Sequence, residues 1–148
     1  MKDLYESSIK DYPKFDLQFD ENSFEITLKG VFEILGKGSL DFSNNERILS
    51  KTKEIAPVKN LEEDKYGWWK LEKGVYKIVF NETLELNEEI SARVYSRKSL
   101  IDCGAYVPEI NLNKGYKGNI KALLVIENPE GINLKQNARI CKLSLINE

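Results

Sequence analysis

Hydrophobic and polar residues alternate over several short stretches of the chain, and this period of two predicts β-strands. In FEITLK (Phe24–Lys29), every second residue is apolar, and VFEIL follows after Gly30, which suits a bulge or bend. The other predicted strands are GVYKIVF (Gly74–Phe80), SARVY (Ser91–Tyr95), NIKALLVI (Asn119–Ile126) and ARICKLSLI (Ala138–Ile146). Because turn residues separate these short strands, we expect an all-β sandwich, barrel or jelly roll.

Two segments break this pattern and predict short helices. The first is Lys2–Lys10. The second runs from Ser96, whose hydroxyl suits a helix N-cap, to Gly104, which suits the left-handed position after a helix. Its first turn would place free backbone N–H groups beside two cations and a hydroxyl, the ingredients of a phosphate site: Arg97, Lys98 and Ser99. A solvated helix start with two surface cations is the plainer alternative.

The stretch YVPEINLNKGYKG predicts a strand that turns at Asn113–Gly118, since Asn-x-Gly supplies the left-handed positions of a tight hairpin. Tyr116 could present its ring to a sugar or base, or pack as an ordinary tyrosine at a hairpin tip. Trp68 and Trp69 would face opposite sides of a strand. We expect a core or subunit-contact role for this pair rather than ligand stacking.

Composition narrows the classes of function. The 148 residues, with 41% hydrophobic and 31% charged, fit a single globular domain spanning 1–148. No run of 18 apolar residues or secretory signal is present, so we expect a cytoplasmic protein with no membrane span. Cys103 and Cys141 should then stay reduced. A net charge of −2 disfavours nucleic acid as a partner, and the absence of histidine excludes Ser-His-Asp, Cys-His and His-metal sites.

The order of these pieces resembles the dUTPase and dCTP deaminase superfamily. NSFEITLKGVFEI (Asn22–Ile34) is similar to the opening motif, and VYKIVFNETLELNEEISARVYSRKSL (Val75–Leu100) is similar to the strand, loop and phosphate-binding turn of archaeal members. LNKGYKGNIKALLVI resembles the nucleoside-binding hairpin with its following strand, and LKQNARICKL resembles the fourth motif. The resemblance extends from about Asn22 to Leu145.

This resemblance implies a jelly-roll-like or distorted β-barrel subunit with one short helix, assembled as a homotrimer with active sites at subunit interfaces. It implies a pyrimidine deoxynucleotide, dUTP or dCTP, as ligand, with magnesium bound through its phosphates and no metal held by the protein itself. Carried over residue by residue, it assigns phosphate contacts to Arg97, Lys98, Ser99 and Lys142, and the deoxynucleoside pocket to Asn113, Gly115 and Tyr116.

The sequence departs from the family at its acidic positions. The hairpin carboxylate that serves the attacking water in dUTPases falls on Asn113, and an amide cannot act as a general base. The glutamate of dCTP deaminases falls on Leu123, while a hydroxyl and an arginine of the deaminase turn fall on Lys98 and Asp102. Glu25 replaces the aspartate of the opening motif. The chain stops at Glu148, so the glycine-rich closing arm of dUTPases is expected to be missing.

Glu109 is the nearest replacement for the lost acid along the strand. It shares a face with Asn113 but would lie roughly 13 Å away in an extended strand, which is too far to serve the same water without a bend at Pro108. Two hypotheses remain. The first is a dUTPase-fold homotrimer that binds a pyrimidine deoxynucleotide or a partner after losing the standard catalysis. The second is a divergent dUTP diphosphatase that produces dUMP and pyrophosphate.

Overall fold

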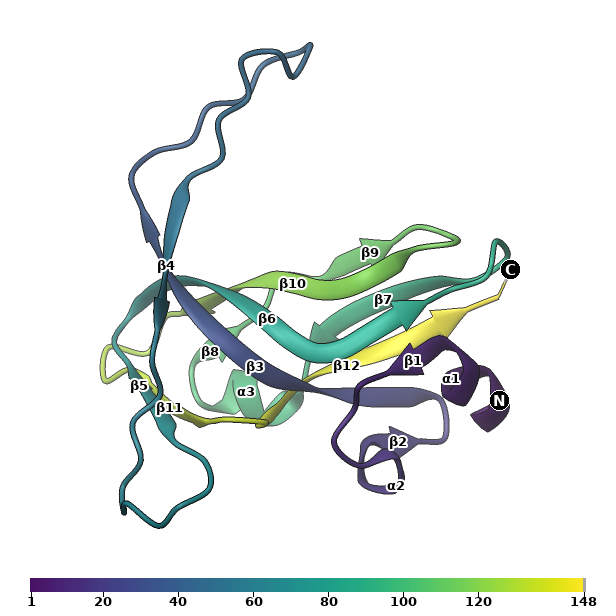
Figure 1. The fold of residues 1–148 in the computed structure, drawn as a ribbon, viewed down its shortest axis with the longest axis horizontal. Coiled ribbons are helices and arrows are strands. Elements are labelled where there is room, and N and C mark those ends of the chain that lie inside the picture. Colours follow the sequence, from purple (N-terminus) through teal and green to yellow (C-terminus); the bar gives the residue numbers. More distant parts are fainter. Residues whose placement is uncertain (148) are drawn as a thin grey trace.

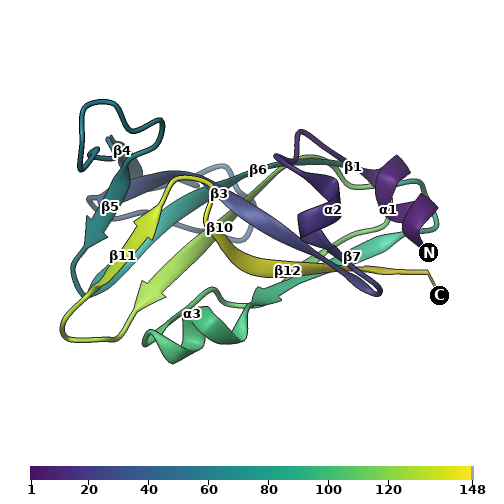
Figure 2. The same cartoon turned by 90° about the horizontal axis from the view of Figure 1, so that it is seen from below.

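The computed structural model describes residues 1–147, which form a curled sheet with short helices at its ends (Figures 1 and 2). The helices in this range are α1 (Lys2–Ser8), α2 (Phe15–Gln18) and α3 (Lys98–Asp102). The strands are β1 (Ile9–Lys10), β2 (Phe19–Asp20), β3 (Ser23–Leu35), β4 (Lys51–Ile55), β5 (Trp68–Leu71), β6 (Gly74–Glu85), β7 (Ser91–Ser96), β8 (Ala105–Tyr106), β9 (Ile110–Leu112), β10 (Lys117–Ile126), β11 (Ile132–Lys135) and β12 (Arg139–Ile146).

The main sheet has the strand order β8-β10-β6-β3-β12-β7-β9, with β1, β2 and β4 attached to β6 or β3. Strands β5 and β11 form a separate pair. The all-β prediction is confirmed, and so is the helix near the N-terminus, which the structure gives as α1. None of the helices within residues 1–147 is long and apolar enough to cross a membrane.

Strand β3 is the longest strand of the sheet and forms its corner. Its first part, Phe24–Thr27, pairs with β12, and its later part, Leu28–Glu33, pairs with β6. The two predicted stretches on either side of Gly30 form one continuous strand. The predicted irregularity is present, because the register against β6 shifts between Leu28 and Gly30.

The core lies inside the curl of the sheet, where alternate residues of the long strands meet. Its largest fully buried side chains include Tyr5, Phe24, Ile26, Leu28, Ile78, Phe80, Leu84, Ile120 and Leu124. Trp69 is also buried, and its Nε1 donates to the Ile55 carbonyl at 2.8 Å, whereas Trp68 is half-buried. The prediction that one of the two tryptophans belongs to the core is confirmed for Trp69.

The predicted hairpin at Asn113–Gly118 is not a hairpin in its pairing. Strand β9, before the turn, pairs with β7, while β10, after it, pairs with β6 and β8. The turn therefore connects strands near opposite ends of the sheet order, and β9 and β10 are not paired with each other. Local sequence identified the turn correctly, but the partners of its flanking strands depend on tertiary packing.

Glu82 is a fully buried carboxylate at the corner of β3. It accepts hydrogen bonds from Thr27 N at 2.9 Å, Thr27 Oγ1 at 2.7 Å and Gln18 Nε2 at 2.8 Å. Gln18 also donates to the Glu25 carbonyl at 2.8 Å, so the same cluster attaches α2 to β3. Burial raises the pKa of Glu82, and the hydrogen bonds only partly offset that effect.

We expect Glu82 to make the free energy of unfolding depend on pH. Its pKa is higher in the folded than in the unfolded chain, so its contribution is fully present below the unfolded-state pKa and is lost as pH rises through the folded-state pKa. Urea unfolding of wild type and Glu82→Gln between pH 4 and pH 8 should give a difference in unfolding free energy that falls as pH rises. Glu89→Gln, at an exposed position, is the control. A difference independent of pH would contradict the raised pKa.

Candidate functional site

The turn after β7 is shorter than the sequence suggested. Ser96 is the last residue of β7 and does not cap the helix; its Oγ accepts from Val107 N at 2.8 Å and donates to the Val107 carbonyl at 3.2 Å. Arg97 is the N-cap residue instead, and α3 has only 5 residues. Gly104 has a φ of +76°, as predicted, and a Cβ there would lie 2.7 Å from Asn128 Cβ. The predicted Ser96 cap was therefore wrong, while the predicted end of the helix is confirmed.

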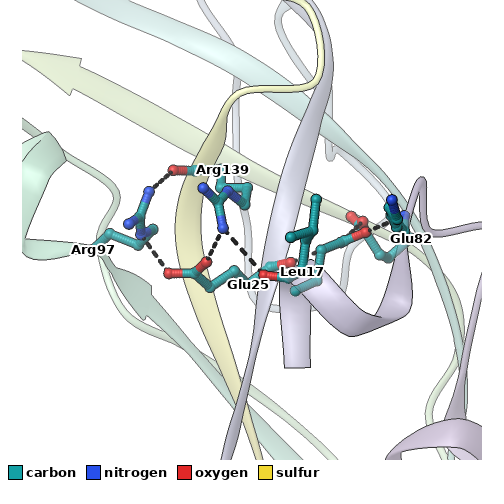
Figure 3. A network of polar contacts seen from close by, with 7 residues as sticks. Leu17, Glu25, Glu82, Arg97 and Arg139 are labelled. Carbon is teal, nitrogen blue, oxygen red and sulfur yellow. Dashed lines mark hydrogen bonds and ion pairs between the residues drawn. The ribbon is translucent and has the colours of Figure 1, made fainter. Parts of the chain in front are cut away.

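Glu25 lies between two arginines beside this turn (Figure 3). Its Oε2 is 2.7 Å from Arg97 Nε, and its Oε1 is 2.9 Å from Arg139 Nη1. Arg97 Nη1 also donates to the Arg139 carbonyl at 2.7 Å, and Arg139 Nη1 donates to the Leu17 carbonyl at 3.1 Å. The Glu25 side chain is only 12% exposed. Two guanidinium groups against one carboxylate leave this cluster with a net positive charge.

The ion pair with Glu25 fixes the position of Arg97 but leaves some of its N–H donors available to a ligand. A guanidinium carries five N–H donors, so an anion arriving at the turn could bind Arg97 while Glu25 still holds it. Lys142 belongs to the same neighbourhood, because it lies directly opposite Glu25 in the pairing of β12 with β3 and therefore on the same sheet face. The structure thus places Arg97 in an ion pair with Glu25 and Lys142 opposite Glu25 on the neighbouring strand.

The other two residues of the predicted phosphate turn lie nearby on α3. Lys98 forms an ion pair with Asp102 at 2.9 Å, but the Lys98 side chain is 87% exposed, so the pair contributes little and can open. Ser99 lines a shallow cavity of about 170 Å³ between α3 and β12. Asp102, weighed as a deaminase-turn position, is engaged by Lys98 and does not reach the hairpin turn.

The predicted deoxynucleoside residues cluster at the turn between β9 and β10. Tyr116 N donates to the Asn113 carbonyl at 3.0 Å, and Gly115 N donates to the Asn87 carbonyl at 3.0 Å. The Tyr116 hydroxyl donates to the Asn119 carbonyl at 2.6 Å, and its half-buried ring packs against the core. This arrangement favours the packed-tyrosine interpretation over a ring presented for stacking.

Sequence inspection missed an acidic side chain at this turn. Gly115 has a φ of +77°, and a Cβ there would lie 2.9 Å from a carboxylate oxygen of Glu88. Glu88 comes from the connection between β6 and β7. It lies within the quoted stretch Val75–Leu100, but the resemblance gave it no role in the site. Backbone hydrogen bonds join the two loops, among them Gly115 N to the Asn87 carbonyl and Leu86 N to the Tyr116 carbonyl. Glu109, the replacement considered from sequence, instead pairs with Arg93 at 3.0 Å.

The two groups of predicted residues lie far apart in one subunit. The turn at Asn113 follows Leu112, which pairs with Ala92 at the start of β7, and Arg97 follows the end of β7. Strand β7 has 6 residues, and a strand of that length at about 3.3 Å per residue extends roughly 20 Å. Figure 1 likewise shows α3 well away from the β9–β10 turn.

A cavity of about 360 Å³ lies on the outer face of β10, next to β6. Leu123, the position of the deaminase glutamate, is 41% exposed here and contributes an apolar wall. The other lining residues are Lys77, Pro108, Glu109, Ile110, Lys121 and Ala122. This is an apolar pocket with charged residues at its rim, and Leu123 offers no group that could transfer a proton there.

The cysteines offer no activated nucleophile within this site. Both are free thiols, as expected, with Cys103 exposed and Cys141 buried in β12. Burial raises the pKa of the Cys141 thiol to about 12, so it is inert at neutral pH.

Comparison with known proteins identifies the family. The chain belongs to the dCTP deaminase-like family, whose model matches residues 1–147. It is 39% identical over 128 residues to a probable deoxyuridine 5′-triphosphate nucleotidohydrolase of Methanosarcina mazei, covering 86% of this chain and 71% of that protein. It is 36% identical over 141 residues to a protein of the same name from Archaeoglobus fulgidus, covering 95% and 79% of the respective chains.

Solved structures support the same fold. The dCTP deaminase of Agrobacterium tumefaciens superposes with a TM-score of 0.67 at 14% identity, over 99% of this chain and 46% of that one. This chain therefore corresponds to less than half the length of that deaminase. The EIAV dUTPase superposes with a TM-score of 0.52 at 10% identity, over 95% and 88% of the respective chains. The dUTPase-like fold predicted from sequence is confirmed.

Gly115→Ala should destabilise the turn by more than left-handed backbone strain alone. Alanine at such a φ costs about 1–2 kcal/mol, and the new Cβ would also meet Glu88. Gly36→Ala is a matched control, because Gly36 has a φ of +76° and an alanine Cβ there would have nothing within 4 Å. In urea unfolding at fixed protein concentration, Gly115→Ala should lose more stability than Gly36→Ala. In a Glu88→Ala background, the stability lost through Gly115→Ala should fall to the value for Gly36→Ala. If that loss is unchanged, Glu88 does not lie against Gly115.

Proposed function

We propose that this protein binds a pyrimidine deoxynucleotide as a homotrimer and that it has lost the standard catalysis of its family. The observation that supports binding is the positively charged cluster of Arg97, Arg139 and Lys142 around Glu25, at the turn that resembles the family's phosphate site. The triphosphate would contact Arg97 and Lys142, with Lys98 and Ser99 closing from α3. Asn113 and Leu123 stand where the acidic groups of the two enzyme classes belong.

The separation of the two predicted halves of the site supports assembly. A single nucleotide cannot contact groups at both ends of β7 when these lie roughly 20 Å apart. If one copy supplies the Arg97 turn and another supplies the Asn113 turn, both groups reach one ligand. Exposed apolar residues on the outer sheet face also need cover. These are Leu123 and, in part, Val125, whereas Ile126 is buried in the core.

Magnesium would enter this site with the nucleotide. Residues 1–147 contain no group of three or more acidic or cysteine side chains that could hold a metal ion. Glu25, the acid of the opening motif, is already bound by two arginines. The residues present therefore fit a magnesium ion that is coordinated by the phosphate oxygens of the nucleotide. Such an ion would neutralise part of the phosphate charge. The protein's own task is then to bind the remaining phosphate charge through Arg97 and Lys142.

The names of the curated relatives favour one alternative, hydrolysis of dUTP to dUMP and pyrophosphate. This function needs a group that activates water near Asn113. Glu88 is a carboxylate at the same turn, which makes it the first candidate for that role. Because Glu88 comes from the β6–β7 loop and not from the position of Asn113, it would have to act from a different side of the turn. Measurement of products decides between binding alone and hydrolysis.

We expect wild-type protein to hydrolyse dUTP near the background rate and Asn113→Asp to gain turnover. A general base contributes roughly 10²–10⁴-fold to the rate, and the amide of Asn113 cannot accept a proton from water. Products from dUTP and dCTP with magnesium should be separated by chromatography. Asn111→Asp, on exposed β9, is the control for added charge. Rapid wild-type hydrolysis that is lost in Glu88→Gln would instead establish the enzyme with Glu88 as its base.

Arg97→Ala should weaken nucleotide binding by about 1.5–3 kcal/mol, or roughly 10- to 150-fold in Kd, as expected for loss of a charge-assisted hydrogen bond. Calorimetry with dUTP and a non-hydrolysable analogue would measure it. Arg93→Ala is the matched control, because Arg93 lies on β7, the strand that leads into the Arg97 turn, and pairs with Glu109 instead of Glu25. Circular dichroism should be unchanged, since Arg139 still pairs with Glu25. If Arg97→Ala and Arg93→Ala bind the nucleotide with equal affinity, Arg97 does not contact the nucleotide.

A further inference from the structure

Residues 36–50 form an arm that projects from the sheet between β3 and β4 (Figure 1, top). Ser39 and Ile48 pair across it, with N–H to carbonyl distances of 2.7 and 2.8 Å. Its tip is fixed by Asp41, whose carboxylate accepts from Ser43 Oγ at 2.7 Å and from Glu46 N at 3.2 Å. The tip therefore has a defined shape, although it stands clear of the sheet of its own chain.

The arm carries a concentration of exposed large apolar side chains. Leu40 is 80% exposed, Phe42 is fully exposed, and Ile48 and Leu49 are also exposed. A two-stranded ribbon by itself is only marginally stable in water. The apolar side chains on the arm would stabilise it only if another surface removed them from water. An ordered apolar projection of this kind is typical of a contact made with another surface.

The chain carries a matching surface on the outer face of β6 and β10. Leu123 and Val75 are exposed there, and Val125 lies opposite both Val75 and Tyr106 in the sheet. The 360 Å³ cavity beside Leu123 could take an aromatic ring. Its charged lining residues are Lys77, Lys121 and Glu109, of which Glu109 is paired with Arg93.

A second copy of this chain satisfies both surfaces at once. The arm points away from its own sheet, so it cannot cover the cavity of its own chain. Arm and cavity are different surfaces, and a contact between them is head-to-tail, which closes into a ring when the rotation permits. The charges are complementary on balance. At the arm tip, Asp41 and Glu46 outnumber Arg47. At the cavity, Glu109 is already paired with Arg93, which leaves Lys77 and Lys121 to attract the tip.

We propose that the arm of one copy docks on the outer face of β6 and β10 of the next, with Phe42 in the cavity beside Leu123. The copy number of the ring rests on the homotrimer of the proposed function, but the contact itself requires no nucleotide. The arm thereby becomes part of the neighbour's cavity, which is incomplete without it. Loss of the arm contact would separate the copies even where each chain remains folded.

Cysteine cross-linking tests the contact directly. In a Cys103→Ser background, Phe42→Cys and Leu123→Cys are made singly and together, and oxidised in air with copper phenanthroline. The double variant should give covalent multi-copy species on non-reducing gels, and a mixture of the two single variants should give a covalent dimer. Neither single variant alone should cross-link. Cross-linking by Phe42→Cys alone, or none in the double variant and the mixture, would overturn the proposal.

Light scattering separates this proposal from the proposed function. Phe42→Ser combined with Leu40→Ser should shift the mass from that of the assembly toward one chain of 17.1 kDa, while Val58→Ser, an exposed apolar residue off the arm, should not. An intact assembly in the arm variant would overturn the arm contact and leave the homotrimer standing. A monomeric wild type would overturn both. Cross-linking as expected in a protein that binds no nucleotide would overturn the proposed function alone.

Discussion

The buried carboxylate of Glu82 accepts the hydrogen bonds of Thr27, where β3 changes its pairing partner and the sheet turns its corner. At Thr27, β3 stops pairing with β12 and begins to pair with β6, so the backbone there must find other partners. A buried N–H without an acceptor costs about 1–3 kcal/mol, and Glu82 accepts both Thr27 N and Thr27 Oγ1. Asn137 N and Leu28 N bond the neighbouring turn to the same corner. The corner then divides the molecule into a polar half and a half with an apolar outer face.

Each half of the sheet carries one part of the chemistry. The half formed by β3, β12, β7 and β9 presents Glu25, Lys142 and the Arg97 turn. The half formed by β3, β6, β10 and β8 presents the cavity at Leu123, and the arm extends from its β3–β4 edge. Since both halves share β3, its kink sets their relative orientation. A substitution at the corner would therefore alter the phosphate cluster and the outer face together.

The sequence was informative wherever a feature depends on near neighbours. Alternating residues located the long strands, and Gly104 marked the end of α3. Contacts across strands have no such local pattern. The pairing of Glu25 with Arg97 and Arg139 joins residues 72 and 114 positions apart, by their numbering in the chain. Ser96 looked like a cap because a serine hydroxyl prefers orphan amides, but here the amide of Val107, just after β8, was the better-placed donor.

The choice of cations supports the separate roles of the two halves. Arginine occurs only at Arg47, Arg93, Arg97 and Arg139, and the latter two hold Glu25. A planar guanidinium can keep a fixed orientation against a carboxylate while offering further donors, whereas a lysine ammonium is a single flexible charge. Lysines instead line the rim of the cavity, where a neighbour's acidic groups need attraction without fixed geometry. Rigid cations therefore suit the proposed phosphate site, and mobile cations suit the proposed contact between copies.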